Sequence, residues 1–111
     1  MAATVHTVED FRRSPTSALF QGREAIGVSM FILAYSRGQG PHLHQHPYAE
    51  VFLVQEGEAT FTVGDEQITV EAERIVVVPP ETPHGFKCSG DGTLRVVSVH
   101  PSPEVIQTDL E

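Results

Sequence analysis

Three histidines and a carboxylate lie close together in segment 38–57, which reads GQGPHLHQHPYAEVFLVQEG. His44 and His46 are two residues apart, and Glu50 follows four residues after His46. Because residues i and i+2 of a β-strand lie on the same face, the two imidazoles can stand side by side. Two imidazoles and a carboxylate form most of a first-row transition-metal site, and His84 is a downstream candidate for the missing ligand. The sequence therefore indicates a metal site built on β-strands.

The elements that must position these side chains are short apolar runs separated by glycine and proline. Segment 26–36 is rich in β-branched and aromatic residues, and segment 58–63 alternates apolar with polar residues. Gly64 and Asp65 then predict a two-residue hairpin turn. Further strands are expected over 50–56, 66–72, 74–80, 84–88 and 93–100. Short strands at this even spacing predict an antiparallel sandwich or barrel.

The histidine segment resembles the first motif of the cupin superfamily. That motif is Gly, five residues, His-x-His, three or four residues, Glu, six residues and Gly, and the chain matches it with Gly38, His44, His46, Glu50 and Gly57. The second cupin motif, Pro-x-Gly-x-x-His followed by Asn, is matched in part by Pro79 and His84. With the flanking strands, the resemblance covers most of the chain.

The resemblance implies an all-β, single-domain cupin, which is an antiparallel β-barrel of jelly-roll type. We divide the chain into an N-terminal arm or edge strand (1–15), the cupin barrel (16–104) and a short C-terminal tail (105–111). In the tail, the residues after Pro103 could form one helical turn. The resemblance also implies a homodimer, in which the arm crosses to the partner.

The resemblance further implies that the barrel holds a metal ion on His44, His46, Glu50 and His84. Three neutral imidazoles and one carboxylate suit iron, manganese, nickel, zinc or copper better than magnesium or calcium. The ligand types do not select among these metals. We expect a cavity beside the site with an apolar lining, drawn from Phe31, Leu33, Phe52, Val54, Phe61, Phe86 and Val97.

The other histidines fit the motif less well. If His42 and His44 formed the His-x-His pair, Ser36 would occupy the glycine position and Glu50 would lie six residues after the second histidine. The pair His44 and His46 is therefore preferred, and His42 is placed at the cavity rim or among the residues that surround the metal ligands. We expect His6 and His100 to be structural or surface residues.

Three residues depart from the second cupin motif. Glu81 occupies its glycine position, Cys88 stands where asparagine is usual, and Glu73-Arg74 replaces the Gly-Asp of many relatives. A glycine in a turn commonly supplies a positive φ, so Glu81 either strains the turn or marks a different one. We expect Cys88 to be a small buried apolar residue rather than a ligand.

The composition limits the partners. The 111 residues include 15 acidic and 7 basic side chains, with a net charge of −8 and scattered arginines. This balance disfavours nucleic acid and anionic membrane surfaces as partners. The single cysteine, Cys88, forms no internal disulfide, and no signal-peptide pattern or spanning apolar run is seen. We therefore expect a cytoplasmic protein.

Two functions are consistent with these features. The first is a metal-dependent enzyme, of dioxygenase or isomerase type, that acts on a small organic molecule. The alternative is a non-catalytic cupin module that binds a small ligand or the metal itself. No catalytic residue beyond the metal ligands is assigned, because the sequence contains no clear acid–base pair and no nucleophile motif.

Overall fold

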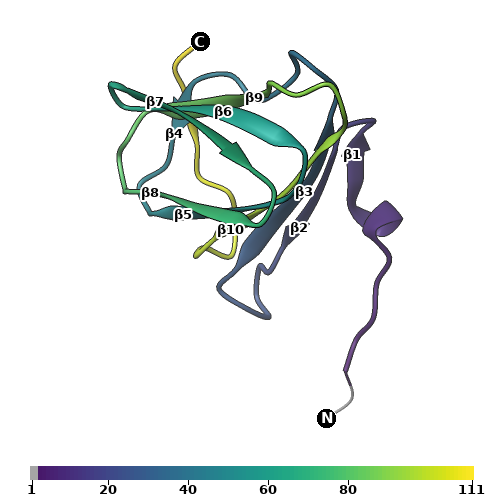
Figure 1. Ribbon diagram of the computed structural model, residues 1–111. Helices are drawn as coiled ribbons and strands as arrows, with labels where there is room; N and C mark the ends of the chain where they lie inside the picture. The colour runs from purple at the N-terminus through teal and green to yellow at the C-terminus, as the bar shows by residue number, and fades with distance from the viewer. Residues whose placement is uncertain (1–2) are drawn as a thin grey trace.

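The computed structural model describes residues 3–111, which are all-β apart from one short 3₁₀ helix, η1 (Val8–Phe11). Within this range the strands form two antiparallel sheets that face each other, as Figure 1 shows. The first sheet, in spatial order, is β1 (Arg12–Ser14), β2 (Ser17–Gln21), β3 (Ser29–Tyr35), β10 (Leu94–His100), β5 (Glu50–Glu56) and β8 (Arg74–Val78). The second is β11 (Thr108–Asp109), β4 (His44–Gln45), β9 (His84–Cys88), β6 (Glu58–Val63) and β7 (Glu66–Glu71).

This architecture confirms the predicted all-β fold of jelly-roll type. The two sheets remain separate hydrogen-bonded units in residues 3–111, so the molecule is a jelly-roll sandwich rather than a fully closed barrel. The hairpin predicted at Gly64 and Asp65 joins β6 to β7, and Gly64 has a φ of +57°. No helix in residues 3–111 has the length and apolar character needed to cross a membrane.

Strand alternation sets the core. In β5, Glu50, Phe52 and Val54 point inward and are buried, whereas Val51 and Leu53 are exposed on the outer face. Phe52 joins Phe61 and Phe86 in an aromatic cluster with ring-centroid separations of 4.8–5.5 Å. The two sheets are held together mainly by burial of this apolar surface.

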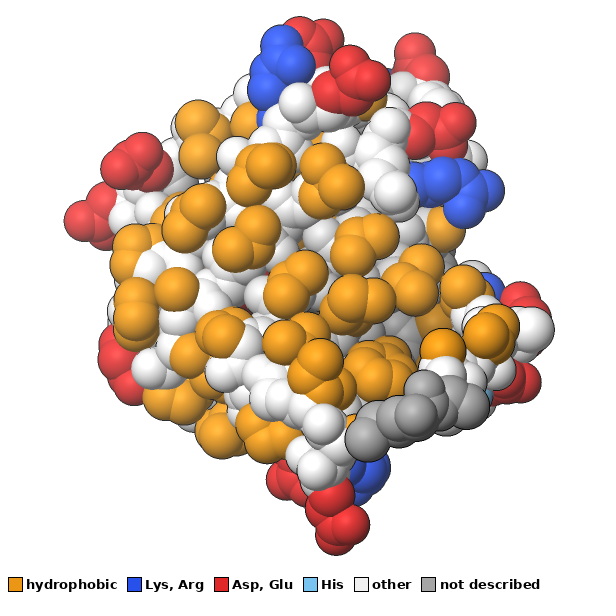
Figure 2. All heavy atoms as spheres, turned by 90° about the horizontal axis from the view of Figure 1, so that it is seen from below, with side chains coloured by type: hydrophobic (Ala, Val, Ile, Leu, Met, Phe, Trp, Pro, Cys, Tyr) orange, Lys and Arg blue, Asp and Glu red, His pale blue; other side chains and the backbone are white. Residues whose placement is uncertain are grey.

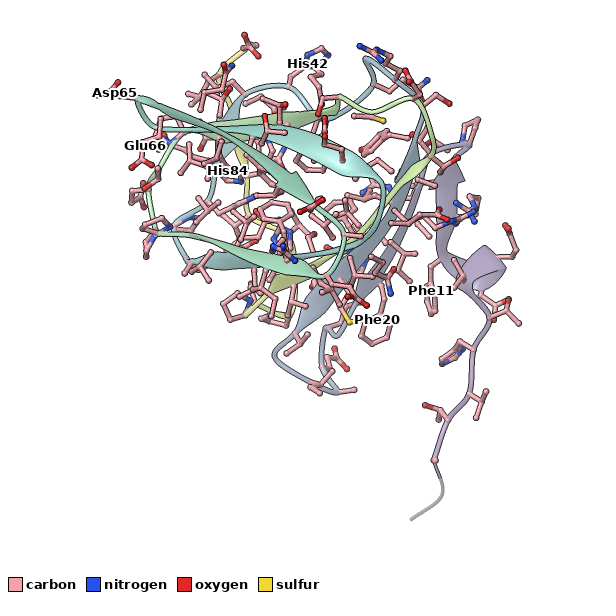
Figure 3. All side chains as sticks on the ribbon, in the orientation of Figure 1. Phe11, Phe20, His42, Asp65, Glu66 and His84 are labelled. Atoms are coloured by element: carbon pink, nitrogen blue, oxygen red, sulfur yellow. The ribbon has the colours of Figure 1, made fainter. Side chains whose placement is uncertain are left out.

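Segments near both ends of the described chain, η1 and β11, pack against the sheets. Phe11 of η1 stacks edge-on against Phe20 of β2 at 5.4 Å between ring centroids, and both rings are labelled in Figure 3. The prediction of a helical turn after Pro103 was wrong. Thr108 and Asp109 instead pair with β4 as strand β11, opposite Gln45 and His44. The division into arm, barrel and tail remains a prediction.

Two glutamates occupy turn positions where the cupin pattern has glycine. Glu73 has a φ of +66° and Glu81 a φ of +57°, so both adopt the left-handed conformation. For a residue with a Cβ, this conformation costs about 1–2 kcal/mol of conformational free energy. The departures from the motif therefore leave the turns in place, with strain at Glu73 and Glu81. The backbone N–H of Glu81 donates to the His46 carbonyl oxygen at 2.8 Å, which ties this turn to the histidine segment.

Candidate metal centre

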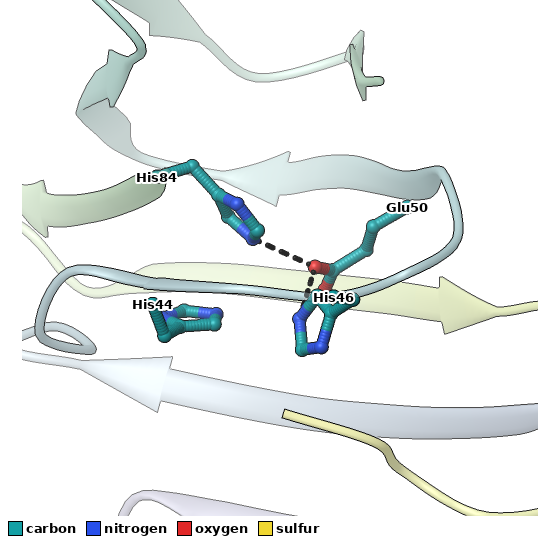
Figure 4. Close-up of side chains that lie close together, drawn as sticks. All are labelled: His44, His46, Glu50 and His84. Carbon is teal, nitrogen blue, oxygen red and sulfur yellow. Dashed lines mark hydrogen bonds and ion pairs between the residues drawn. The ribbon is translucent and has the colours of Figure 1, made fainter. Parts of the chain in front are cut away.

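The candidate centre lies between the two sheets, where three strands and one loop meet. His44 lies on β4 and is paired in register with His84 on β9, both in the second sheet. Glu50 begins β5 of the first sheet and faces them, and His46 lies in the loop between β4 and β5. All four side chains are buried, and Figure 4 shows them converging on one point. The structure thus brings together the four residues that the sequence predicted.

The spacing of the donor atoms fits a metal ion. One ligand atom from each of His44, His46, Glu50 and His84 lies within 4.8 Å of the others. Glu50 Oε1 is 3.0 Å from His46 Nε2 and 2.9 Å from His84 Nε2. Ligands about 2.1 Å from a common ion lie about 3 Å apart at right angles and about 4 Å apart when opposite. The cluster is therefore already close to the dimensions of a coordination sphere.

Hydrogen bonds on the far side of each ring orient the three imidazoles. The Nδ1 atoms of His44, His46 and His84 face the carbonyl oxygens of His42, Ile106 and Thr82 at 2.6, 2.8 and 2.8 Å. Carbonyl oxygens only accept, so this network assigns the proton to Nδ1 in each ring. In the neutral rings, Nε2 is then an unprotonated lone pair directed into the cluster. This is the arrangement that metal-binding histidines need.

The polar atoms of the cluster do not all find hydrogen-bond partners within the cluster. Among the described residues, His46 Nε2 is fully buried and has no partner aligned for a hydrogen bond. Lone pairs on nitrogen and a carboxylate at about 3 Å repel each other unless a cation or a proton lies between them. A buried polar atom left in this state is costly. A divalent metal ion bound at this point would satisfy it, so the residues present fit the group that the sequence implied.

The pKa values reflect the same crowding. Burial raises the pKa of Glu50, but hydrogen bonds from His100, His46 and His84, which the last two can donate only when their rings are protonated, outweigh it and hold that pKa far below its usual range. Burial lowers the pKa of His44. Burial alone would lower the pKa of His46, but hydrogen bonds to the Glu50 carboxylate and the Ile106 carbonyl raise this pKa above its ordinary value. The carboxylate is thus ionised and available to a cation.

A fifth histidine adjoins the cluster. His100, at the end of β10, is 1% exposed, and its Nε2 lies 3.0 Å from the second carboxylate oxygen, Glu50 Oε2. Its Nδ1 is 2.7 Å from the Tyr48 hydroxyl, which accepts from the Ile106 N–H at 3.2 Å. The hydroxyl proton is therefore free to be donated to His100 Nδ1, which leaves the His100 proton on Nε2. His100 thus carries its proton on the nitrogen that lies 3.0 Å from Glu50 Oε2, although this N–H is not aligned on that oxygen, whereas the other three rings present lone pairs.

The expectation that His100 is merely structural or superficial missed its contact with Glu50, and the reason is a parity error. We expected Val97 to face the cavity, but in β10 the buried residues are Leu94, Val96, Ser98 and His100. Val97 lies on the opposite face, so its assignment to the lining was wrong. The strict alternation of β10, read from Leu94, would have placed Ser98 and His100 inside.

The remaining candidates lie outside the cluster. His42 is exposed, and Figure 3 shows it away from His84; its backbone carbonyl, rather than its imidazole, serves the site. His6 is exposed near Asp10, as expected for a surface residue. Cys88 is 1% exposed, and its thiol donates to the Gly92 carbonyl oxygen at 3.4 Å. The prediction that Cys88 is buried is confirmed. That it is not a metal ligand stays a prediction.

A cavity of about 210 Å³ opens beside the cluster. Its wall is mostly apolar, and polar groups gather at the end formed by His44, Glu50, Ser98 and His100. Four of the seven residues predicted to line it do so. These residues are Phe31, Leu33, Phe52 and Phe86, and Tyr35 and Pro41 join them. Exposed Gln107 also lines the cavity, which marks the side where it reaches the surface.

Comparison with known proteins identifies the family. Residues 31–100 match the family described as the Cupin domain, which is more than half of the chain. The chain therefore belongs to the cupin family. No curated protein matches the sequence.

Solved structures show the same fold at low sequence identity. An uncharacterized conserved protein with a double-stranded β-helix domain from Klebsiella pneumoniae is 21% identical, with a TM-score of 0.77 and 99% of each chain covered. Oxalate decarboxylase from Bacillus subtilis, described with Mn(II) centres, is 17% identical with a TM-score of 0.76; the match covers 88% of this chain and 29% of the decarboxylase.

An oxalate oxidase in complex with the substrate analogue glycolate is 20% identical, with a TM-score of 0.73; the match covers 87% of this chain and 57% of the oxidase. The chain thus spans under a third of the decarboxylase and somewhat over half of the oxidase. At these identities the likeness concerns the fold. The feature of this chain that bears on function is a buried His/Glu cluster able to bind a metal, in a cupin domain.

Proposed function

We propose that this protein is a metal-dependent enzyme, of dioxygenase or isomerase type, that acts on a small organic molecule. His44, His46, Glu50 and His84 would hold one divalent transition metal ion, with iron, manganese, nickel, zinc and copper as the candidates. The observation that carries the proposal is that three imidazole nitrogens and one buried carboxylate oxygen lie within 4.8 Å of one another, with Nδ1 of each ring facing a carbonyl oxygen. Such a metal ion would supply Lewis acidity, or oxygen chemistry if it is redox-active.

The surrounding residues support catalysis more than storage. The donors open on one side to the cavity, so a small molecule can reach them, whereas a structural metal site is usually closed by its four ligands. His100 adds a proton donor 3.0 Å from Glu50 Oε2, on the same wall of the cavity. The apolar walls formed by Phe31, Phe52 and Phe86 exclude bulk water from the bound molecule.

The residues that line the cavity also limit which substrates it can accept. The oxalate enzymes that share the fold are named for a small dianion, and Mn(II) centres are described in one of them. In this chain, the part of the cavity wall formed by residues 3–111 includes no Lys or Arg to pair with a second negative charge. We therefore favour a molecule with an apolar body over oxalate itself.

The test is turnover by the metal-loaded protein. Apoprotein reconstituted separately with Fe(II), Mn(II), Ni(II), Zn(II) and Cu(II) is mixed with catechols, flavonols and diketones, and oxygen consumption and product formation are followed. Turnover that requires metal and is lost in Glu50→Ala would support the proposal. Tight binding of metal and small molecules without turnover by any metal form would instead favour the alternative, a non-catalytic binding module.

We also propose that the protein forms a homodimer through the outer face of the first sheet. The alternating residues on this face of β3, β10, β5 and β8 are apolar and meet in register across the strands, and we call them the apolar face: Met30, Ile32, Val51, Leu53, Ile75, Val77, Val97 and Val99. Ile75 and Val77 are 66% and 61% exposed, and Figure 2 shows hydrophobic side chains over this side, with the charged groups near its edge.

A second copy of the chain is the partner that this surface fits. A contiguous exposed apolar patch typically marks a protein–protein contact. Two chains that each carry a net charge of −8 repel each other, and an uncharged face allows them to approach through a two-fold axis. The measurement is mass by light scattering: wild type and Gln67→Lys, on the exposed side of β7, should be dimeric, and Leu53→Lys monomeric. A monomeric wild type would contradict the proposal.

We propose a cytoplasmic location as well. Its support is the single cysteine, which is a buried free thiol in the fold. Fractionation of cells that produce the natural protein would test this location.

A further inference from the structure

Ser98 is a polar exception in an apolar wall. It lies on the inner face of β10, where it is paired in register with Phe31 of β3 on one side and Phe52 of β5 on the other. Leu94 and Val96, which share its face, are fully buried and apolar. Ser98 itself is 1% exposed and lines the cavity beside the candidate metal centre. A hydroxyl group is thus held between two phenylalanine rings at the cavity wall.

The Ser98 hydroxyl has no hydrogen-bond partner within residues 3–111. A buried hydroxyl without a partner is unfavourable for folding, so alanine at this position would give a more stable protein. Groups that lower stability without satisfying the fold are typical of binding and catalytic sites. The hydroxyl is therefore available to a molecule in the cavity.

The size of the cavity limits that molecule. An apolar protein cavity of about 150 Å³ is known to hold one benzene molecule. The cavity here, at about 210 Å³, has room for one ring with one or two small substituents. Four aromatic residues, Phe31, Tyr35, Phe52 and Phe86, contribute to its wall, and aromatic side chains pack well against a flat ring.

We propose that the cavity binds a single-ring molecule with a ring-bound hydroxyl or carbonyl oxygen, and that Ser98 Oγ hydrogen-bonds to that oxygen. The inference rests on the proposed function in placing this molecule beside the four metal-binding side chains. Ser98 is then the residue that selects an oxygen-bearing ring over a purely hydrocarbon ring of the same shape. Discrimination arises because the hydrocarbon leaves the serine hydroxyl unpaired.

The test compares two ligands of nearly equal shape, phenol and toluene, in wild type, Ser98→Ala and Ser29→Ala. Ser29 is the matched control, because it is equally buried but its hydroxyl donates to the Ser102 carbonyl oxygen at 2.8 Å. Dissociation constants are measured by NMR titration of the full chain, both metal-loaded and metal-free. Thermal unfolding is measured without ligand, and metal content is measured for every protein.

In Ser98→Ala, we expect the affinity for phenol to fall by about three- to tenfold, with the affinity for toluene unchanged or higher. The unfolding temperature should rise in Ser98→Ala and fall in Ser29→Ala, and metal content should stay at the wild-type level. Equal phenol affinity in wild type and Ser98→Ala, or failure of wild type to bind either ring, would overturn the inference. Absence of metal from wild type would refute the proposed function separately, because the phenol comparison is also made in metal-free protein.

Discussion

The interior of this protein has two ends that are built from the same strands and buried to the same degree. At one end β5, β9 and β10 contribute Val54, Cys88 and Leu94, and at the other they contribute Glu50, His84 and His100. We call these the apolar end and the polar end. In the apolar end each side chain is satisfied by contact with its neighbours. In the polar end, within the part of the chain described, His46 Nε2, His100 Nε2 and Ser98 Oγ have no aligned partner.

The difference shows that a side chain can be fully buried without having its hydrogen-bonding groups paired. The apolar end explains why the chain folds, because apolar burial is favourable without any ligand. The polar end is tolerated because the apolar end and the sheet hydrogen bonds stabilise the fold independently of it. Unsatisfied groups that converge on one point, in an otherwise well-packed interior, indicate that something else completes them.

Substitutions in the polar end should change metal affinity more than any other substitution does, and should leave the fold intact. Replacing His46 or Glu50 with alanine should abolish metal binding, because each supplies one of only four predicted ligand atoms, while circular dichroism should still show a folded β protein. Metal affinity is measured by competition with a chelator of known affinity. The matched control is His42→Ala, which removes an exposed imidazole two residues from His44 and should bind metal like wild type. Full metal content in His46→Ala would show that the ligand assignment is wrong.

The apolar end should show the reverse pattern. Phe61 is fully buried and stacks on Phe86 at 4.8 Å between ring centroids. Phe61→Ala should lower the free energy of unfolding by about 3–5 kcal/mol, as measured by urea denaturation of the metal-free protein. The fraction that remains folded should bind metal with wild-type affinity. If it lost metal as completely as Glu50→Ala does, the two ends would not be independent.

The next effect concerns the residues behind Glu50. We expect Tyr48 and His100 to be positioning residues that act through Glu50, because His100 Nε2 lies 3.0 Å from Glu50 Oε2 and the Tyr48 hydroxyl lies 2.7 Å from His100 Nδ1. Tyr48→Phe and His100→Ala should each weaken metal binding by about 10–100-fold. Tyr48→Phe keeps the ring that stacks on His46 at 5.2 Å and removes only the hydroxyl.

A spectroscopic readout distinguishes this positioning role from a general loss of structure. The visible absorption spectrum of the Co(II)-substituted protein should shift in Tyr48→Phe, because His100 would no longer be fixed beside the Glu50 carboxylate. An unchanged spectrum with unchanged affinity would show that Tyr48 does not act on the site.

The smallest expected effect lies at the turn next to the polar end. Glu81 has a φ of +57°, which glycine adopts without a steric penalty. Glu81→Gly should therefore raise the free energy of unfolding by about 0.5–1 kcal/mol, which is the strain relieved less the entropy that glycine adds to the unfolded chain. Metal affinity should not change, since the backbone bond to His46 is kept. A loss of stability would mean that the Glu81 side chain, 3.3 Å from Gln45 Nε2, matters more than the strain.

How much of this could be predicted differs between strands. The spacing of His44, His46 and Glu50 placed three side chains in one site because it matches the family motif; strand alternation was the weaker reason, since His46 lies in the loop after β4. His84 followed from the second motif, although Glu81 and Cys88 depart from it. His100 was missed because β10 carries valines on both faces, which hides its parity. Alternation read from Leu94 and Arg95 does place His100 inside, and pairing with β5 agrees by placing Val99 opposite Val51.

Contacts that depend on distant segments were beyond prediction for a different reason. The Tyr48–His100 bond joins residues 52 positions apart, and the Ile106 carbonyl that orients His46 comes from the C-terminal tail. No local pattern encodes such pairings, because they depend on how the loops cross the end of the sandwich. The strand β11 was missed for the same reason, since its two residues are fixed by pairing with β4 rather than by their own propensity.

We propose above all that the four converging side chains hold one metal ion. Elemental analysis of the protein purified without added metal, with His84→Ala prepared in parallel, tests it most directly. We predict about one divalent transition metal ion per chain in the wild type and almost none in His84→Ala. Wild type that stays metal-free even after incubation with Mn(II), Fe(II) and Zn(II), or equal metal in both proteins, would show that these four residues are not a metal site.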